Sequence, residues 1–115
     1  MNSYQEQIDA KLKLAEDLIG APLSEAERKE FQSYTVDSIV GVKLIRSIDS
    51  EELKACLKDK AKGEALRQRI GGRGTNPSWV VSMIAETLYT RNEIDEQKLD
   101  ALMEWGELGS VEIPL

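Results

Sequence analysis

Apolar residues are densest between Asn76 and Arg91, and this stretch is the centre of the predicted fold. At about 100° per residue, its apolar side chains cover about 200° of a helix, which is wider than the stripe of an ordinary surface helix. These side chains are Trp79, Val80, Val81, Met83, Ile84 and Leu88. Asn76 is a suitable N-cap, and Pro77 suits the first helical position. We therefore expect residues 76–91 to form a buried helix against which the others pack.

Two helices are predicted before residue 35. In residues 3–19, apolar positions recur at three- and four-residue spacing, which is typical of an amphipathic helix. The apolar positions are Tyr4, Ile8, Leu12, Ala15, Leu18 and Ile19. Gly20 is a plausible stop, and Pro22 prevents continuation. Ser24 and the glutamate three residues later match a capping box, so a short and mostly exposed helix is expected from Ser24 to about Tyr34.

Residues 35–48 fit two periodicities. One helical face would carry Val36, Val40, Leu44 and Ile48. However, Val40, Val42 and Leu44 alternate as in a strand, and β-branched residues are frequent. Because every neighbouring segment is predicted to be helical, a strand would have no partner, and we favour a helix. Gly41 would then mark a close contact between helices.

The segment from Asp49 to Thr75 predicts a helix, a bend and a glycine-rich connection. Its first apolar face consists of Leu53, Cys56, Leu57 and Ala61. Beyond this face the apolar positions rotate, so we expect a break or bend near Lys62–Gly63. Gly71 to Thr75 then predicts a flexible connection into the central helix.

The last helix is predicted from Asp95, its N-cap, to about Trp105. We expect its inward-facing residues to be Leu99, Leu102 and Met103. Residues 107–115 form an extended tail, in which Val111, Ile113 and Leu115 alternate with other residues. Such a tail suits either addition to a partner's sheet edge or packing across its own core.

Together these patterns predict an all-α protein, in which residues 1–115 form one compact domain of five to six helices. The extended tail at about 107–115 completes it. No apolar run approaches the ~20 residues of a membrane span, so we expect no membrane partner. A cytoplasmic location is the default expectation, because the chain start lacks the basic and apolar regions of a signal peptide.

Composition excludes several kinds of chemistry. The chain has no histidine and one cysteine, Cys56. Within one chain this removes an internal disulfide, an imidazole or thiolate metal site, and a Ser–His–Asp or Cys–His catalytic device. We therefore expect no metal, no cofactor and no catalytic residues, and we predict that the protein is not an enzyme.

The net charge of −6 is distributed unevenly along the chain. Residues 1–53 carry −5, residues 54–73 carry +5, and residues 74–115 carry −6. Such a distribution suits a partner guided by electrostatic attraction. The alternative is that the opposite charges neutralise each other within the fold.

The basic segment supplies most candidate binding residues, which are Lys54, Lys58, Lys62, Arg67, Arg69 and Arg73. The three lysines are spaced by four and would line one helical face. Such a ridge suits nucleic-acid phosphates or an acidic protein surface. The alternative is a solvated face near Glu51, Asp59 and Glu64. No aromatic residues are interleaved with these cations, so stacking on single-stranded nucleic acid is not indicated.

Two further features carry a functional hypothesis. Gly71–Gly74 with Arg73 resembles a phosphate-binding loop in composition, but the P-loop pattern is absent, and the alternative is a hinge. Trp79 and Trp105 are both expected in the core, but Trp105, near a chain end, is the better placed of the two to anchor an interface. We therefore expect an interaction module such as an inhibitor, adaptor or accessory subunit. Another protein is the expected partner, and a nucleic-acid-associated regulator is the alternative.

Overall fold

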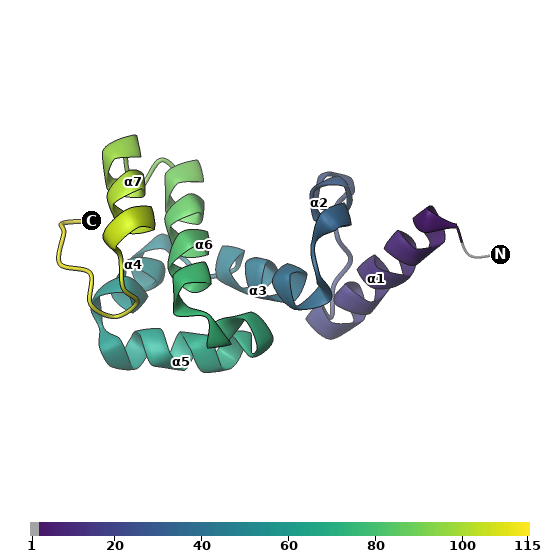
Figure 1. The fold of residues 1–115 in the computed structure, drawn as a ribbon, viewed down its shortest axis with the longest axis horizontal. Coiled ribbons are helices and arrows are strands. Elements are labelled where there is room, and N and C mark those ends of the chain that lie inside the picture. Colours follow the sequence, from purple (N-terminus) through teal and green to yellow (C-terminus); the bar gives the residue numbers. More distant parts are fainter. Residues whose placement is uncertain (1–2) are drawn as a thin grey trace.

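The fold is all-α, as seen in a computed structural model that describes residues 3–115 (Figure 1). Within these residues there are seven α-helices, two short 3₁₀ helices and no strand. In chain order they are α1 Tyr4–Ile19, α2 Glu25–Glu30, η1 Phe31–Ser33, α3 Val36–Arg46, α4 Ser50–Lys58, α5 Lys60–Ile70, η2 Gly72–Thr75, α6 Pro77–Thr90 and α7 Glu96–Trp105. The predicted count of five to six helices was therefore too low. Residues 1–2 of the predicted domain lie outside the described part.

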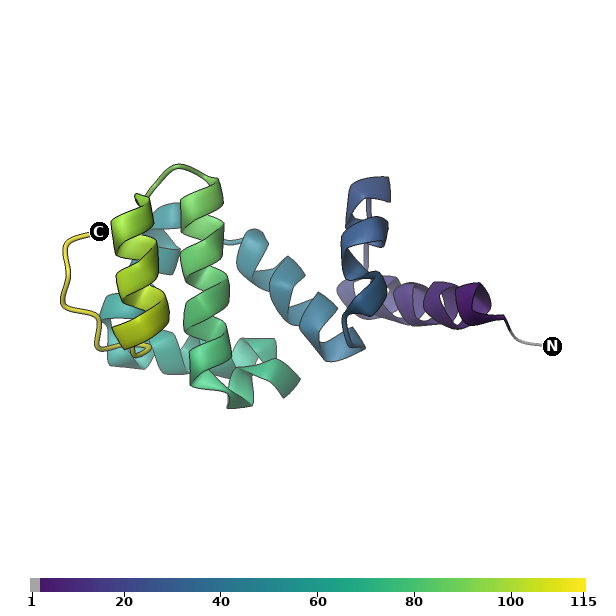
Figure 2. The same ribbon diagram turned by 45° about the horizontal axis from the view of Figure 1, so that its top comes forward.

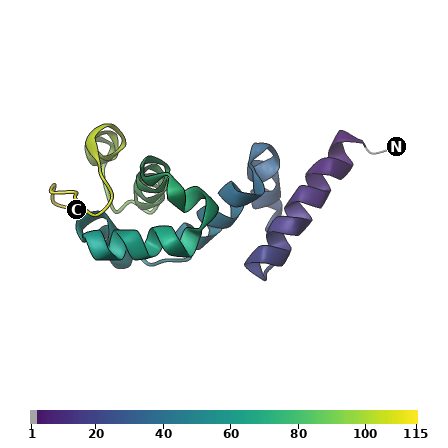
Figure 3. The ribbon, with the colours of Figure 1, turned by 60° about the horizontal axis from the view of Figure 1, so that its bottom comes forward.

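The helices are arranged along one long axis, and the molecule measures 53 × 27 × 22 Å. Helices α1 and α2 form one end, while α7 and the C-terminal tail form the other (Figures 1 and 2). Helix α3 lies between the two ends. Helices α6 and α7 lie side by side, with α5 running beneath them (Figure 3).

Helix α6 is the buried hub that the sequence predicts. Val80, Ile84, Ala85 and Leu88 are completely buried. The helix packs against α3, α4 and α7, and it begins at Asn76, whose side chain accepts a hydrogen bond from the Trp79 amide. The central position of residues 76–91 is therefore confirmed.

Two apolar clusters hold the elements together. The larger one joins α4, α5, α6, α7 and the end of α3. The smaller one joins α1, Leu23, Phe31 of η1 and the first part of α3. Trp79 and Met83 of α6 pack against both clusters and connect them.

The ambiguous segment 35–48 is a helix, as we favoured. Thr35 caps α3, because its hydroxyl accepts a hydrogen bond from the Ser38 amide. The expected close contact at Gly41 is also confirmed: a Cβ there would lie 2.8 Å from the Trp79 ring and 3.3 Å from Ile70. Any side chain at this position would therefore separate α3 from α6.

The helix break predicted near Lys62–Gly63 lies instead at Asp59. Asp59 has an extended backbone, which ends α4. Its carboxylate accepts a hydrogen bond from the Lys62 amide and so caps α5. A side-chain cap that starts a new helix explains the additional helix in the count. Gly63 lies inside α5 at a crossing, where a Cβ would be 2.9 Å from the Cys56 carbonyl oxygen.

The connection predicted to be flexible at Gly71–Thr75 is an ordered 3₁₀ helix. Gly71 has a φ of +74°, which glycine adopts without strain. Gly74 is buried against α5, and a Cβ there would lie 2.0 Å from the Arg67 carbonyl oxygen. Gly71 therefore provides the positive φ that starts this segment, and Gly74 allows its close packing against α5.

The C-terminal tail lies across the protein's own core. The Val111 amide donates to the Leu57 carbonyl at 3.0 Å, and Val111 itself is buried. Leu108, Ile113 and Leu115 pack against the larger cluster. Of the two predicted arrangements for this tail, the structure selects the intramolecular one. Separately, none of the helices in residues 3–115 combines the length and the apolar character that crossing a membrane requires.

Candidate interaction surfaces

The basic residues of the segment 54–73 do not form the predicted single ridge. Because the helix breaks at Asp59, Lys54 and Lys58 lie on α4, whereas Lys62 lies on α5. The Lys62 Nζ is 4.0 Å from the Glu52 carboxylate, and both side chains are about half exposed. The expectation that the three lysines share one helical face was therefore wrong.

Lys54 is directed toward acidic side chains of its own chain. Its Nζ lies 3.1 Å from a Glu93 carboxylate oxygen and 3.4 Å from Glu51, and its side chain is only 15 % exposed. The hydrogen bond to Glu93 raises the pKa of Lys54. Lys54 thus connects α4 to the turn before α7.

Arg67 and Arg73 hold the segment η2 in place. Arg67 Nε donates to the Gly74 carbonyl at 2.7 Å, and its Nη1 donates to Glu64 at 3.0 Å. Arg73 Nε donates to the Ser38 hydroxyl at 2.8 Å, which ties η2 to α3. By contrast, Lys58 and Arg69 are exposed and form no ion pair among residues 3–115.

The end of α7 carries the largest exposed apolar surface near the C-terminus. Trp105 is 78 % exposed, and Met103, two residues earlier in the same helix, is 46 % exposed. The sequence predicted that Met103 faces inward, which was wrong: α7 packs on α6 through the buried Leu102, whereas Met103 is left half-exposed. Asp100, Glu104 and Glu107 are exposed nearby in the sequence.

Helix α1 also exposes apolar side chains. Tyr4 and Leu18, which we assigned to its buried face, are 76 % and 62 % exposed, and Leu14 is also exposed. Only the stripe that meets α3 and η1 is covered, and it includes Ile8 and Leu12. The partners of this helix are too few to cover the full apolar face that the sequence describes.

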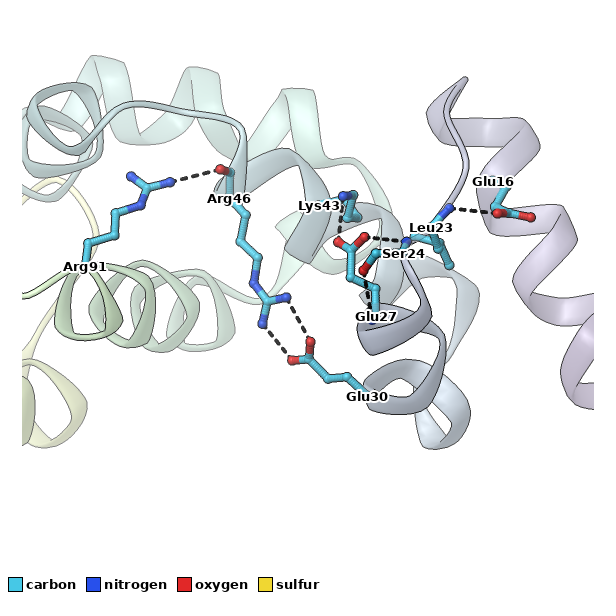
Figure 4. Close-up of polar contacts among 8 residues, drawn as sticks. All are labelled: Glu16, Leu23, Ser24, Glu27, Glu30, Lys43, Arg46 and Arg91. Atoms are coloured by element: carbon cyan, nitrogen blue, oxygen red, sulfur yellow. Dashed lines mark hydrogen bonds and ion pairs between the residues drawn. The ribbon is translucent and has the colours of Figure 1, made fainter.

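A row of polar contacts spans the junction between the two ends (Figure 4). Lys43 of α3 pairs with Glu27 of α2 at 2.6 Å. Arg46 forms two hydrogen bonds to the Glu30 carboxylate, at 2.7 and 2.9 Å. Arg91 of α6 continues the row by donating to the Arg46 carbonyl at 2.9 Å. None of these contacts was predicted, because the partners are at least 16 residues apart.

Ion pairing perturbs the acids of α2. Burial of Glu27 favours its neutral form, but the hydrogen bonds from Lys43 and Ser24 outweigh burial and lower the pKa of Glu27. The hydrogen bonds from Arg46 likewise lower the pKa of Glu30. Both carboxylates are therefore stabilised in their charged form by the fold.

Two grooves lie beside this row. One groove, of about 510 Å³, lies at the surface between α3 and α6, and it is lined in part by Val42, Ile45 and Met83. The other, of about 420 Å³, lies between α1, α3 and α5 and is lined in part by Leu18 and Arg69. Both have mixed apolar and charged walls. The first groove is lined by two acids, Glu30 and Glu86, of which Glu30 is already paired with Arg46.

The remaining reactive group is Cys56, which is buried, and burial raises the pKa of its thiol. A buried neutral thiol packs as a small apolar side chain and is a poor nucleophile. Within residues 3–115, no three acidic or cysteine side chains are grouped so that they could hold a metal ion.

Comparison of the chain with models of protein families, with curated proteins and with solved structures finds no match.

Proposed function

We propose that the protein is a non-enzymatic interaction module, an inhibitor, adaptor or accessory subunit that binds another protein through the end of α7. The observation that carries this proposal is the 78 % exposure of Trp105 in the last turn of α7. Tryptophan is enriched among the residues that dominate binding energy, and its large apolar surface is unfavourable in water. The other tryptophan, Trp79, is half-buried between the two clusters and serves the fold.

The partner's surface follows from the charges around Trp105. Asp100, Glu104 and Glu107 are exposed on the same part of the chain, and residues 74–115 carry a net charge of −6. A complementary partner would have an apolar pocket for the indole and a basic rim around it. Regulation of that partner, in the cytoplasm, is the role we propose.

Nucleic-acid association is the second candidate function. It is supported by exposed cations of the basic segment: Lys58, Lys62 and Arg69. It is weakened by the intramolecular contacts of Lys54 and Arg67, which leave fewer cations available for phosphates.

Capture from the native host's lysate tests the first proposal. The immobilised protein should retain a specific partner, and Trp105→Ser should lose it. Removing an interface tryptophan of this kind costs about 2 kcal/mol or more, which is about 30-fold in Kd. Tyr4→Ser is the matched control, because Tyr4 is equally exposed but lies at the opposite end of the molecule. Equal retention by wild type and Trp105→Ser would contradict the proposal.

A salt titration with mixed-sequence duplex DNA separates the second candidate from the first. Absence of binding at low salt would eliminate nucleic-acid association. If the duplex binds, the double variant Lys58→Glu with Lys62→Glu should reduce the affinity and the salt dependence, because each phosphate contact releases counterions. Binding that is unchanged in the double variant would show that these lysines are not responsible.

A further inference from the structure

A third cavity lies where the two apolar clusters meet. It has a volume of about 300 Å³ and is lined by residues from η1, the start of α3, η2 and α6. These are Ser33, Tyr34, Thr35, Ser38, Arg73, Trp79 and Met83. One cation, several hydroxyl groups and an aromatic wall therefore surround a space between two packed units, which is a common position for small-molecule sites.

Arg73 is held in this cavity from two sides. Its Nε donates to the hydroxyl of Ser38, a residue that is only 6 % exposed, and this hydroxyl also accepts a hydrogen bond from Thr35. The Arg73 guanidinium carbon lies 5.8 Å from the centre of the Trp79 ring. The guanidinium is thus oriented before any ligand arrives, which lowers the entropic cost of binding.

The terminal nitrogens of Arg73 have no partner among residues 3–115, and no carboxylate in that range lies within 4.0 Å. Arg91 shows the contrast. Its two terminal nitrogens donate to the carbonyls of Ile48 and Arg46, so the paired donors of this guanidinium are already used within the protein. The two terminal nitrogens of the Arg73 guanidinium present two parallel N–H donors, a geometry that matches a carboxylate.

The surroundings favour a monoanion over a phosphate dianion. Asp37 is near, and its carboxylate packs against Gly72, where a Cβ would lie 2.6 Å from its Oδ2. Its negative charge opposes a second charge on the ligand. Ser33 and Tyr34 also line the cavity and carry hydroxyl groups that can donate to a ligand, whereas the Thr35 hydroxyl already donates to Ser38.

We propose that this cavity binds a small carboxylate with a flat apolar body, with the carboxylate on Arg73 and the body against Trp79 and Met83. This binding site is independent of the protein interaction proposed for Trp105, which lies on a different helix.

Benzoate titration of the ¹⁵N-labelled protein tests the proposal. The two tryptophans give two indole N–H signals, and Trp105→Phe removes one and so identifies the other. We expect benzoate to move the Trp79 indole signal and the amide signals of Thr35 and Ser38 in a saturable manner, while the Trp105 signal stays in place. Absence of a saturable shift at about 10 mM would overturn the proposal, because even weak specific sites have Kd values near 1 mM.

Two probes separate charge from shape on the wild-type protein. Benzamide has the same ring without the charge, and acetate has the charge without the ring. Both should bind at least about tenfold more weakly than benzoate, since each lacks one of the two contacts. Equal binding of either probe would overturn the proposed arrangement.

Arg73→Gln should weaken benzoate binding by at least about tenfold, because the paired donors are lost. Arg69→Gln is the matched control, because Arg69 is an exposed arginine that does not line the cavity, and it should bind benzoate like the wild type. Unchanged binding by Arg73→Gln would overturn the proposal. If this variant fails to fold, the comparison of benzoate with benzamide on the wild type decides the question.

Discussion

The two ends of the molecule are held together by different physical means. Helices α4–α7 bury a continuous apolar cluster around α6, in which Ile84 and Leu88 are completely inaccessible. At the other end, α2 buries no residue at all, and ion pairs with α3 hold it in place. The first arrangement gains its stability from the hydrophobic effect, whereas the second adds electrostatic contacts that respond to pH and salt.

This difference predicts different stabilities for the two ends. Partly exposed ion pairs contribute about 0–1 kcal/mol each to the free energy of unfolding. Burial of apolar area contributes more. We therefore expect α1 and α2 to open locally while the cluster around α6 stays folded. Trp79 and Met83 contact both clusters, so α6 connects the two ends without making them equally stable.

The largest effect is expected for Ile84→Ala. Ile84 lies at the middle of α6 and is completely buried, so the substitution leaves a cavity and should cost about 3 kcal/mol. Urea unfolding followed by circular dichroism measures the loss. Glu86→Ala is the control, because Glu86 is exposed on the same helix, and it should change stability by less than about 0.5 kcal/mol. Similar losses for both variants would contradict the central role of α6.

Leu12→Ala should have a smaller and local effect. Leu12 of α1 is buried in the smaller cluster, so its truncation should weaken the docking of α1 on α3. Hydrogen exchange should become faster in α1, whereas the protection of α6 should stay near that of the wild type. Leu14→Ala is a suitable control, because Leu14 is exposed on the same helix. Equal loss of protection in α1 and α6 would show that the two ends unfold as one unit.

The smallest expected effect is the loss of stability of α2 at low pH. The fold lowers the pKa of Glu27 and Glu30, so their contribution is complete above the unfolded value of about 4.3 and is lost as the pH falls through the lower folded values. Below pH 4, we expect α2 to lose amide protection before α6 does, at a cost below about 1 kcal/mol. Glu27→Gln should reduce this pH dependence. An identical acid response in wild type and Glu27→Gln would contradict the assignment.

Features decided within a few residues were predictable from the sequence. The capping box of Ser24 and Glu27 forms as expected, because both groups contact backbone amides three residues away. The helical state of residues 35–48 was inferred from the helices predicted on either side. The close contact at Gly41 was inferred from the missing side chain. By contrast, the expectation that Trp105 lies in the core was wrong, because the structure leaves it 78 % exposed.

Features that depend on distant partners were not predictable. The cavity around Arg73 depends on Ser38, which is 35 residues away in the sequence, and the row at the junction pairs Arg46 with Glu30 across 16 residues. One local feature was also missed: Asp59 caps α5 through the Lys62 amide, and this cap interrupts the helix that the lysine spacing in residues 54–62 predicted. Helical periodicity alone placed Met103 on an inward face and Leu18 on the apolar face of an amphipathic helix, but both are exposed.

The sequence by itself determined that the chain is helical and which helix is central, because capping and apolar periodicity act within one or two turns. Only the tertiary structure decided which apolar faces remain uncovered and which charged groups already have partners. Periodicity identifies an apolar face, but its burial depends on whether another element lies against it. At α1 and α7 the packing elements are too few, so Leu18, Met103 and Trp105 remain in contact with water.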